Sequence, residues 1–355
     1  MDTRVIMLDE SNIDEKLVAE AGEIIKSGGL VAFPTETVYG LGGDALNPNS
    51  SEKIYSAKGR PSDNPLIVHI AEFDALEKIV SEIPEAGRKL AERYWPGPLT
   101  MIFKKSDAVP FQTTGGLNTV AVRMPVHKTA LAFIKAGGGY IAAPSANISG
   151  RPSPTCARYV IEDMDGRIDM IIDGGDSGIG LESTIIDLTG DKPMILRPGY
   201  ITEKMLAEVL GQVDTDPTIM DGNCKDRPKA PGMRYRHYAP KGELTIVSGD
   251  EAKVTDYITR QTNIAVALGR QAGIICTDET MEKYDNMQMP DRVSVKSAGS
   301  RTDEEEIAHR LYSILREFDD EAVDVIFSES FDDSNLGQAI MNRLLKAAGH
   351  QVIEL

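Results

Sequence analysis

Residues 28–70 constrain the possible folds of this chain more than any other stretch; they read GGLVAFPTETVYGLGGDALNPNSSEKIYSAKGRPSDNPLIVHI. They join two short apolar runs, 30–33 and 66–70, whose β-branched and aromatic residues are typical of buried strands. The polar residues between these runs include Thr35, Glu36, Thr37, Lys58, Arg60, Ser62 and Asn64. Since ligands of α/β sheets usually bind in the crevice at strand ends, the pattern indicates a site for an anionic small molecule.

Strand and helix patterns alternate through the first two hundred residues. Helices are predicted over 13–25 (with a stop at Gly28-Gly29), 49–57 (capped by Asn49 or Ser50), 73–81, 85–93 and 202–210. Strands are predicted over 99–104, 119–124, 140–143, 168–173, 184–188 and 194–197. We therefore expect one α/β domain over residues 1–212.

Residues 213–241 show no periodicity and contain four prolines, which is typical of a linker. They also contain the run RYRHY at 234–238, and aromatic rings between arginines can stack on a base and contact phosphates. A loop that only packs between domains is the alternative. We expect a linker that closes over an active site as a lid.

From residue 242 a second alternation begins, which predicts a small doubly wound parallel sheet over 242–355. Its predicted strands are 244–247, 264–268, 274–276, 293–295, 323–328 and 352–355, with helices ending near 260 and over 303–318 and 336–348. The acidic segments 303–306 and 319–321 are expected to be solvated surface. This half shows no constellation of chemically active residues.

The charge balance argues against broad adhesion to nucleic acid or anionic membrane, because 38 basic and 55 acidic residues give a formal net charge of −17. The three cysteines are isolated, which fits a reducing compartment. The N-terminus does not resemble a signal peptide, and no run of 18 apolar residues occurs. We expect a soluble cytoplasmic protein that binds no membrane.

Common nucleotide and metal motifs do not fit this sequence. Gly40, Gly42 and Ala45 satisfy G-x-G-x-x-A, but Asn47-Pro48 is expected to block the helix that a dinucleotide fingerprint requires. There is no P-loop, and the five histidines never fall at metal-ligand spacing. We expect no metal site made by the protein alone, so that Mg²⁺ arrives with a nucleotide.

The candidate site residues are cations, hydroxyls and amides without an activated nucleophile, an inventory that suits phosphoryl or nucleotidyl transfer. The cations are Lys58, Arg60, Arg123 and Arg197. Each has a plainer alternative: Lys58 and Arg60 could complement a helix dipole, and Arg123 could be solvated at its strand end. Likewise, the PSAN segment at 144–147 could be an ordinary turn, and His69 could be a core residue.

Five segments together resemble the Sua5/YrdC/YciO family: FPTETVYGLG at 33–42, AKGRPSDNPLIVHI at 57–70, PSAN at 144–147 with SGRPSPT at 149–155, ESTIIDL at 182–188, and APGMRYRHYAP at 230–240. The last resembles the linker of the two-domain Sua5 branch. The resemblance implies a YrdC-like twisted mixed-sheet domain with a concave site, followed by a smaller Rossmann-like Sua5 domain.

The resemblance also implies an L-threonylcarbamoyladenylate synthase, a nucleotidyltransferase that uses L-threonine, bicarbonate and ATP and serves the t6A modification of tRNA. Its threonine pocket would comprise Thr37, His69, Arg123, Ala143 and Ser183. Its ATP side would comprise Lys58, Arg60, Asn64, Thr119, Ser145, Asn147, Ser153, Arg197 and Tyr235, with Lys58 and Arg60 as the catalytic cations. The threonylcarbamoyl transferase of the same pathway is an expected partner, and direct tRNA binding is expected to be weak or absent.

Three other functions remain open at this point. A YrdC-like domain can bind RNA, although the net charge argues against it. Transfer of a carbamoyl group from carbamoyl phosphate occurs in hydrogenase-maturation proteins with a similar domain, but their zinc-finger and acylphosphatase segments are absent here. A nucleotide sensor without turnover is the third possibility.

Overall fold

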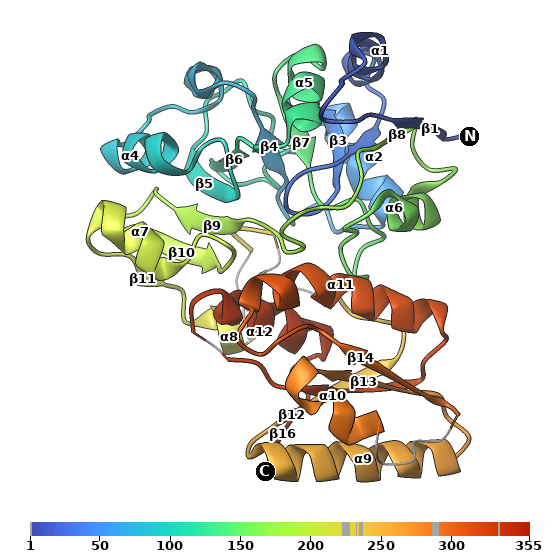
Figure 1. Ribbon diagram of the computed structural model, residues 1–355. Coiled ribbons are helices and arrows are strands. Elements are labelled where there is room, and N and C mark those ends of the chain that lie inside the picture. Colours follow the sequence, from blue (N-terminus) through green and yellow to red (C-terminus); the bar gives the residue numbers. More distant parts are fainter. Residues whose placement is uncertain (1, 222–227, 232, 234–236, 286–290, 333) are drawn as a thin grey trace. The chain divides into compact units, whose positions relative to one another are not determined.

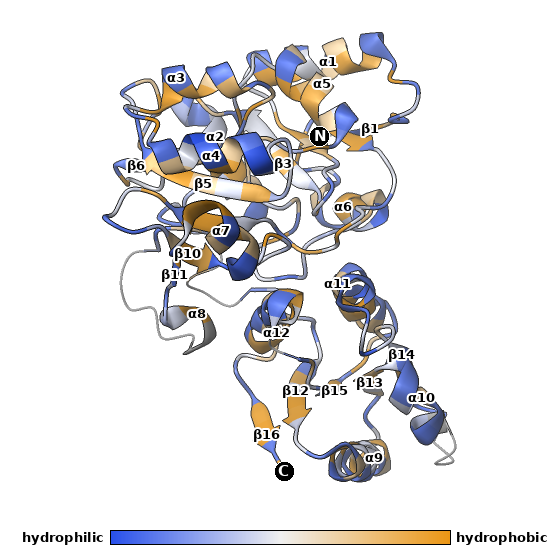
Figure 2. Cartoon of the chain, turned by 60° about the vertical axis from the view of Figure 1, so that its left-hand side comes forward, coloured by the Kyte–Doolittle hydropathy of each residue, from blue (hydrophilic) through white to orange (hydrophobic). Residues whose placement is uncertain are grey.

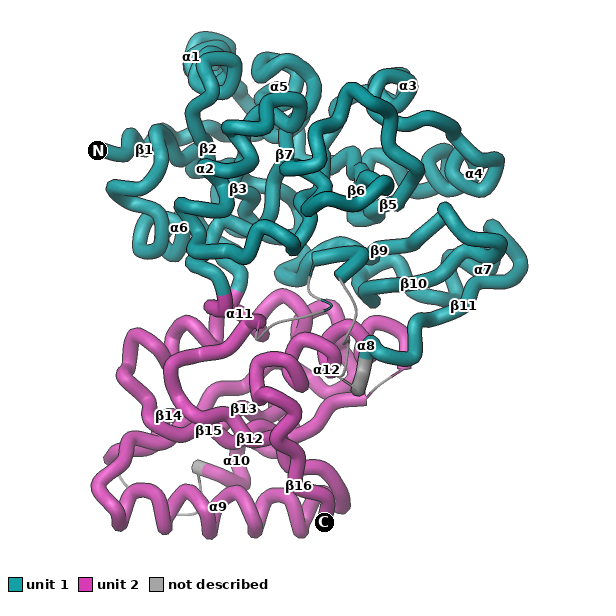
Figure 3. The backbone as a smooth tube through the Cα atoms, turned by 180° about the vertical axis from the view of Figure 1, so that it is seen from behind, with its two compact units in different colours: residues 1–149, 153–234 teal, residues 150–152, 235–355 magenta. Residues whose placement is uncertain are grey.

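The structure is a computed structural model that describes residues 2–221, 228–231, 233, 237–285, 291–332 and 334–355. Its backbone contacts divide the chain into two compact units (Figure 3). Unit 1 comprises Met1–Ser149 and Ser153–Arg234, and unit 2 comprises Gly150–Pro152 and Tyr235–Leu355. The segment 213–241, expected to be a linker, contains the short strand β11 (Asp214–Thr215) and helix α8 (Thr218–Asp221).

Unit 1 is built on one mixed sheet with the strand order β1-β8-β2-β3-β7-β4-β6-β5-β9-β10-β11. The strands are β1 (Arg4–Met7), β2 (Val31–Phe33), β3 (Gly40–Asp44), β4 (Ile67–His69), β5 (Leu99–Lys104), β6 (Thr119–Arg123), β7 (Ile141–Ala143), β8 (Met170–Asp173), β9 (Thr184–Asp187), β10 (Met194–Arg197) and β11. At its centre β4 pairs in parallel with β6 and antiparallel with β7. The expected mixed α/β architecture is therefore confirmed.

The helices of unit 1 cover this sheet, and Figure 1 shows α1 and α5 side by side over one part of it. The helices are α1 (Glu15–Lys26), α2 (Pro48–Lys58), α3 (Leu76–Ile79) after the 3-10 turn η1 (Phe73–Ala75), α4 (Glu85–Tyr94), α5 (Lys128–Ala136), α6 (Ala157–Met164), α7 (Glu203–Leu210) and α8. Helix α1 begins where the Asp14 side chain accepts hydrogen bonds from the backbone N–H groups of Lys16 and Leu17.

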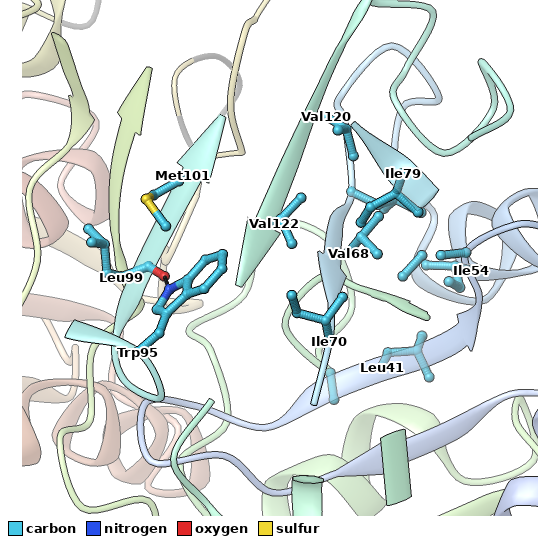
Figure 4. Close-up of a cluster of buried hydrophobic side chains, with 14 of the residues drawn as sticks. Leu41, Ile54, Val68, Ile70, Ile79, Trp95, Leu99, Met101, Val120 and Val122 are labelled. Atoms are coloured by element: carbon cyan, nitrogen blue, oxygen red, sulfur yellow. Dashed lines mark hydrogen bonds between the residues drawn. The ribbon is translucent and has the colours of Figure 1, made fainter. Parts of the chain in front are cut away.

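Strand alternation explains how the central sheet buries both of its faces. Val68 pairs with Val122, which pairs with Met101, and all three belong to the core cluster of Figure 4. Their neighbours Ile67 and Ala121 belong to a different cluster. Within the first cluster, the Trp95 indole N–H donates to the Leu99 carbonyl at 2.7 Å, so its polar atom is satisfied. Layers on both faces thus hold β4 and β6 rigidly.

Strand β3 was not predicted, because its sequence GLGGD is poor in strand-forming residues. Packing explains the glycines. A Cβ atom at Gly42 would lie 2.8 Å from a side-chain carbon of Ile141 and 3.1 Å from the Phe33 ring. Glycine is therefore required where neighbouring side chains cross this strand, and tertiary pairing overrides local preference.

Helix α2 begins earlier than predicted. Its N-cap is Asn47, whose side chain accepts from the Asn49 N–H, and Pro48 is its first residue. The expectation that Asn47-Pro48 blocks a helix was wrong, because proline is well tolerated at the first helical position. The G-x-G-x-x-A match still forms no dinucleotide fingerprint, since Gly40 and Gly42 lie within a strand instead of the turn after one.

Unit 2 is a parallel sheet with the order β14-β13-β15-β12-β16, as expected for a doubly wound domain. Its strands are β12 (Glu243–Ser248), β13 (Ala272–Cys276), β14 (Val293–Ser297), β15 (Val325–Glu329) and β16 (Val352–Glu354). Helices α9 (Glu251–Ala267) and α10 (Asp278–Asp285) lie on one face, and α11 (Glu304–Asp320) and α12 (Asn335–Ala347) on the other (Figure 1).

Two predictions for unit 2 were wrong. Residues 264–268 form no strand, because α9 continues to Ala267 and leaves Ile264 and Leu268 exposed. Figure 2 shows polar and apolar residues mixed along α9, and Val254, Ile258 and Ala265 are buried at helical spacing. Asp319 is not solvated surface, since it is buried and accepts a hydrogen bond from the Lys241 N–H at 2.6 Å.

Candidate functional site

The predicted site residues lie at both ends of the paired strands β4 and β6. His69 is in register with Arg123 where both strands end. Asn64 precedes β4, and Thr119 begins β6. Because Thr119 and Arg123 are four residues apart on one strand, they are separated by roughly 13 Å. The strand pair therefore has two ends with different polar groups, one around Arg123 and one around Asn64.

Arg123, the last residue of β6, contacts the loop between β2 and β3. Its Nη1 donates to the Thr37 hydroxyl at 2.8 Å, and its Nη2 lies 2.7 Å from the Glu36 carboxylate. The side chains of Arg123 and Glu36 are only 5% and 12% exposed. The hydroxyl of Thr37 also lies 2.9 Å from that of Thr35. The predicted neighbours Thr37 and Arg123 are thus in direct contact, in a setting where a guanidinium can bind a carboxylate.

His69 is buried beside Arg123, with its ring edge-on to Phe33 at 5.9 Å between centroids and its Nδ1 3.2 Å from the Ile67 carbonyl oxygen. Burial lowers the pKa of His69 to about 3, and the positive charge of Arg123 adds to this shift. The imidazole is therefore neutral at physiological pH. It can exchange hydrogen bonds with a ligand without adding charge.

The lowered pKa of His69 predicts a dependence of stability on pH. The unfolded chain takes up a proton below about pH 6.5 and the folded chain does not, so stability is complete above pH 6.5 and falls as pH decreases toward 3, by about 1.4 kcal/mol per pH unit. We expect His69→Gln to flatten this part of the profile. Urea unfolding at pH 7 and pH 5, followed through the sole tryptophan, Trp95, measures the effect. Equal pH dependence in both proteins would contradict it.

Ser183 and Arg197 form a second cluster. Arg197 donates from Nε to the Ser183 carbonyl at 3.0 Å and from Nη2 to its hydroxyl at 3.1 Å. The Ser183 hydroxyl also lies 2.7 Å from that of Thr100, a residue in register with Arg123. Arg197, expected on the nucleotide side, is therefore placed directly on a residue of the predicted threonine pocket.

Lys58 is held at the loop that follows β7. Its Nζ donates to the Ser145 carbonyl at 2.5 Å and to the Asn147 carbonyl, and the side chain is buried. The Ser145 hydroxyl donates to the Asn147 side chain at 2.5 Å. Ala143, the last residue of β7, is in register with Ile67. The PSAN segment is therefore a loop organised around a buried ammonium, at the start of β4.

Arg60 and Asn64 lie at this same end. Arg60 donates from Nε to the Asn64 carbonyl at 3.2 Å and from Nη2 to the Pro65 carbonyl at 3.1 Å. Asn64 is 1% exposed, and among the described residues its side-chain oxygen has no hydrogen-bond partner. A buried amide oxygen of this kind is available to a donor from a ligand. Thr119 is half-buried at the start of β6.

Two predicted site residues remain, Ser153 and Tyr235, and the structure describes only the first. Ser153 is buried, and its hydroxyl donates to Glu182 at 2.5 Å, next to Ser183. Tyr235 lies outside the described residues. A hollow of about 790 Å³ in unit 1 is lined by other residues, among them Lys53 and Arg167, and by none of the predicted site residues.

Three polar residues of the site were given no binding role in the sequence prediction: Glu36, Glu182 and Thr100. Glu36 and Glu182 stand inside the TET and EST segments beside predicted residues, so their charge was a visible signal. Thr100 lies within a predicted strand and offered no such signal. Its contact with Ser183 depends on the register between β5 and β9.

Membrane-spanning helices and clusters of metal ligands are both absent from the described parts of the chain. None of their helices combines the length and hydropathy needed to cross a bilayer. They contain no group of three or more His, Cys, Asp or Glu side chains arranged to hold a metal ion.

Comparisons with known proteins cover nearly the whole chain. Residues 23–199 match the family model described as "Telomere recombination", Sua5_yciO_yrdC, and residues 201–349 match the model of the threonylcarbamoyl-AMP synthase C-terminal domain. Threonylcarbamoyl-AMP synthases of Pyrococcus abyssi and Bacillus subtilis are each 46% identical to it, over 99% and 98% of both chains respectively. The crystal structure of P. abyssi Sua5 complexed with L-threonine is 46% identical and superimposes with a TM-score of 0.92, covering 99% of this chain and 100% of that one. The chain therefore belongs to the two-domain Sua5 family of threonylcarbamoyl-AMP synthases.

Proposed function

We propose that this protein is an L-threonylcarbamoyladenylate synthase, a nucleotidyltransferase that converts L-threonine, bicarbonate and ATP into threonylcarbamoyl-AMP and pyrophosphate. The observation that carries the proposal is that two groups of polar side chains are joined by residues 37–41: the Thr37 hydroxyl accepts from Arg123, and the Tyr39 carbonyl accepts the Ala146 N–H of the loop that Lys58 holds. Arg123 with Thr37 and neutral His69 offers a site for a small polar acid in one group. The loops held by Lys58 and Arg60 offer donors and positive charge in the other.

This division suits the two substrates that must meet. The threonine carboxylate would bind Arg123, and its side chain would lie toward His69 and Ser183. The triphosphate would lie toward Lys58 and Arg60. The acceptor and the α-phosphorus would then meet between the two polar groups, so that positioning supplies most of the rate enhancement.

The proposed reaction has two steps. The threonine amine, after losing a proton, attacks the carbon of bicarbonate to give the carbamate and water. A carbamate oxygen then attacks the α-phosphorus, a P–O bond forms, and pyrophosphate leaves with the electron pair of the broken bond. Negative charge grows on the phosphate oxygens in this second step, where the ammonium of Lys58 and the guanidinium of Arg60 would stabilise it.

Magnesium would enter this site on the triphosphate, because the polar groups around Lys58 and Arg60 are cations, amides and carbonyls. The ion would offset phosphate charge and orient the leaving group. The product would pass to a transferase that places the threonylcarbamoyl group on tRNA, which is consistent with a net charge of −17 that disfavours tight tRNA binding by this chain itself.

The experiment that tests the function is pyrophosphate release from Mg-ATP, with L-threonine and bicarbonate each omitted in turn. We expect release only when both are present. Release without threonine would indicate another acceptor or simple ATP hydrolysis. ATP binding without any release would favour a nucleotide sensor, and an RNA gel shift that weakens with salt would favour an RNA-binding protein.

A further inference from the structure

Glu36 forms an ion pair with the Arg123 guanidinium, the group that binds the substrate carboxylate in the proposed function. Its carboxylate lies 2.7 Å from Nη2 of Arg123, and both side chains are largely buried. The Glu36 backbone carbonyl accepts the Ile179 N–H at 2.8 Å, which fixes the residue in its loop. The free site therefore contains a carboxylate of the protein where the substrate brings one of its own.

The charges around this pair make the site complementary to a zwitterion. His69 is neutral, because burial and Arg123 hold its pKa to about 3. Burial also lowers the pKa of His127, against the opposing effect of Glu10 and Glu36, and its Nδ1 lies 3.0 Å from the Glu10 carboxylate, which is 42% exposed. The Arg123 and Glu36 pair thus offers one buried positive and one buried negative charge side by side. A bound α-amino acid also carries one positive and one negative charge, and its carboxylate can face Arg123 while its ammonium group faces Glu36.

We propose that Glu36 receives the α-ammonium group of the substrate and thereby selects α-amino acids over other small carboxylic acids. On binding, the carboxylate of the amino acid pairs with Arg123, and its ammonium group pairs with Glu36. The ion pair between Arg123 and Glu36 is thereby replaced by two ion pairs with the substrate. This inference rests on the proposed function and names the residue that sets substrate class at that site.

Burial gives the exchange its selectivity. An acid without an amino group would draw Arg123 away and leave the Glu36 carboxylate buried without a positive partner, which is strongly unfavourable. Sites that leave their own buried polar groups unpaired with the wrong ligand discriminate far more than sites that lose only apolar contact. The same carboxylate is also placed to accept the proton that the ammonium must lose before carbamate forms.

The test is calorimetric binding of L-threonine and of 3-hydroxybutyrate, which is threonine without its amino group. We expect the wild-type protein to prefer threonine by at least about 100-fold, and Glu36→Gln to reduce this ratio to below about 10-fold, mainly through weaker threonine binding. In turnover, the KM for threonine should rise while the KM for ATP changes less than about 3-fold. Glu36→Asp should restore part of the preference.

Glu10→Gln is the matched control, because it removes a nearby carboxylate that lies against His127 instead of Arg123, and it should keep the wild-type ratio. Trp95 fluorescence checks that each variant is folded. A folded Glu36→Gln protein that keeps the full preference for threonine overturns the inference and leaves the proposed function standing. A wild-type protein that binds no threonine overturns the proposed function, and the inference with it.

Discussion

Replacing Lys58 by methionine is expected to lower kcat for pyrophosphate release by about 100-fold or more. Lys58 is 1% exposed, and its ammonium donates to the carbonyls of Ser145 and Asn147. Methionine fills a similar volume, but it removes the positive charge at the proposed phosphate site and leaves those carbonyl oxygens without their donor. Both losses affect the transition state, because the loop would no longer be held where the triphosphate binds.

Lys53→Met is the matched control for this prediction. Lys53 lies on the same helix, is exposed, and donates from Nζ to the Gly28 carbonyl at 2.6 Å, away from the loop. We expect its kcat to stay within about 3-fold of wild type. Steady-state kinetics with varied ATP, together with Trp95 fluorescence, separates loss of catalysis from loss of fold. A folded Lys58→Met protein with near-normal kcat would exclude Lys58 from the chemistry.

Much of the fold could be predicted because buried strands carry an apolar signal of their own. The runs that became β2, β4, β5 and β6 are short and β-branched or aromatic, and they were found at nearly their true ends. Strand β3 could not be found this way. Its glycines are selected by the side chains of Phe33 and Ile141, which lie more than a few residues away in sequence.

The errors in unit 2 have a related cause. Residues 264–268 are apolar enough for a strand, but Ile264 and Leu268 lie on the outer side of α9, and the buried positions follow a helical spacing that begins at Val254. A short window cannot distinguish an exposed apolar turn of a long helix from a buried strand. Asp319 was misplaced because burial of a carboxylate depends on its partners, here Lys241 and Arg151.

For the site, the sequence is sufficient to predict which polar residues lie at strand ends, but it does not predict which of their side chains contact each other. The sequence places Arg123 and His69 at the ends of strands, and register alone brings them together. Nothing in the sequence says that Glu36 lies on Arg123 or that Thr100 lies on Ser183, because these contacts join segments that are 87 and 83 residues apart. Such pairings decide how the site is charged, and they require the folded sheet.

Replacing Arg123 by lysine is expected to raise the KM for L-threonine by about 100-fold, with the KM for ATP changed by less than about 3-fold. The guanidinium donates a hydrogen bond from Nη1 to Thr37, and its Nη2 lies 2.7 Å from the Glu36 carboxylate, while among the described residues neither Nε nor Nη2 has a partner with hydrogen-bond geometry. A lysine ammonium is a single centre that cannot hold both partners and also clamp a substrate carboxylate with two parallel hydrogen bonds.

Arg167→Lys is the control, because Arg167 is an exposed arginine of the same unit whose Nη1 donates to the Ala57 carbonyl at 3.3 Å. Both substitutions keep the positive charge, so a difference between the two variants reports the loss of the planar, two-pronged geometry of the Arg123 guanidinium. The measurement is pyrophosphate release with threonine varied at saturating ATP and bicarbonate, and again with ATP varied. If Arg123→Lys raised both KM values equally, Arg123 would support the whole pocket instead of binding the amino-acid carboxylate.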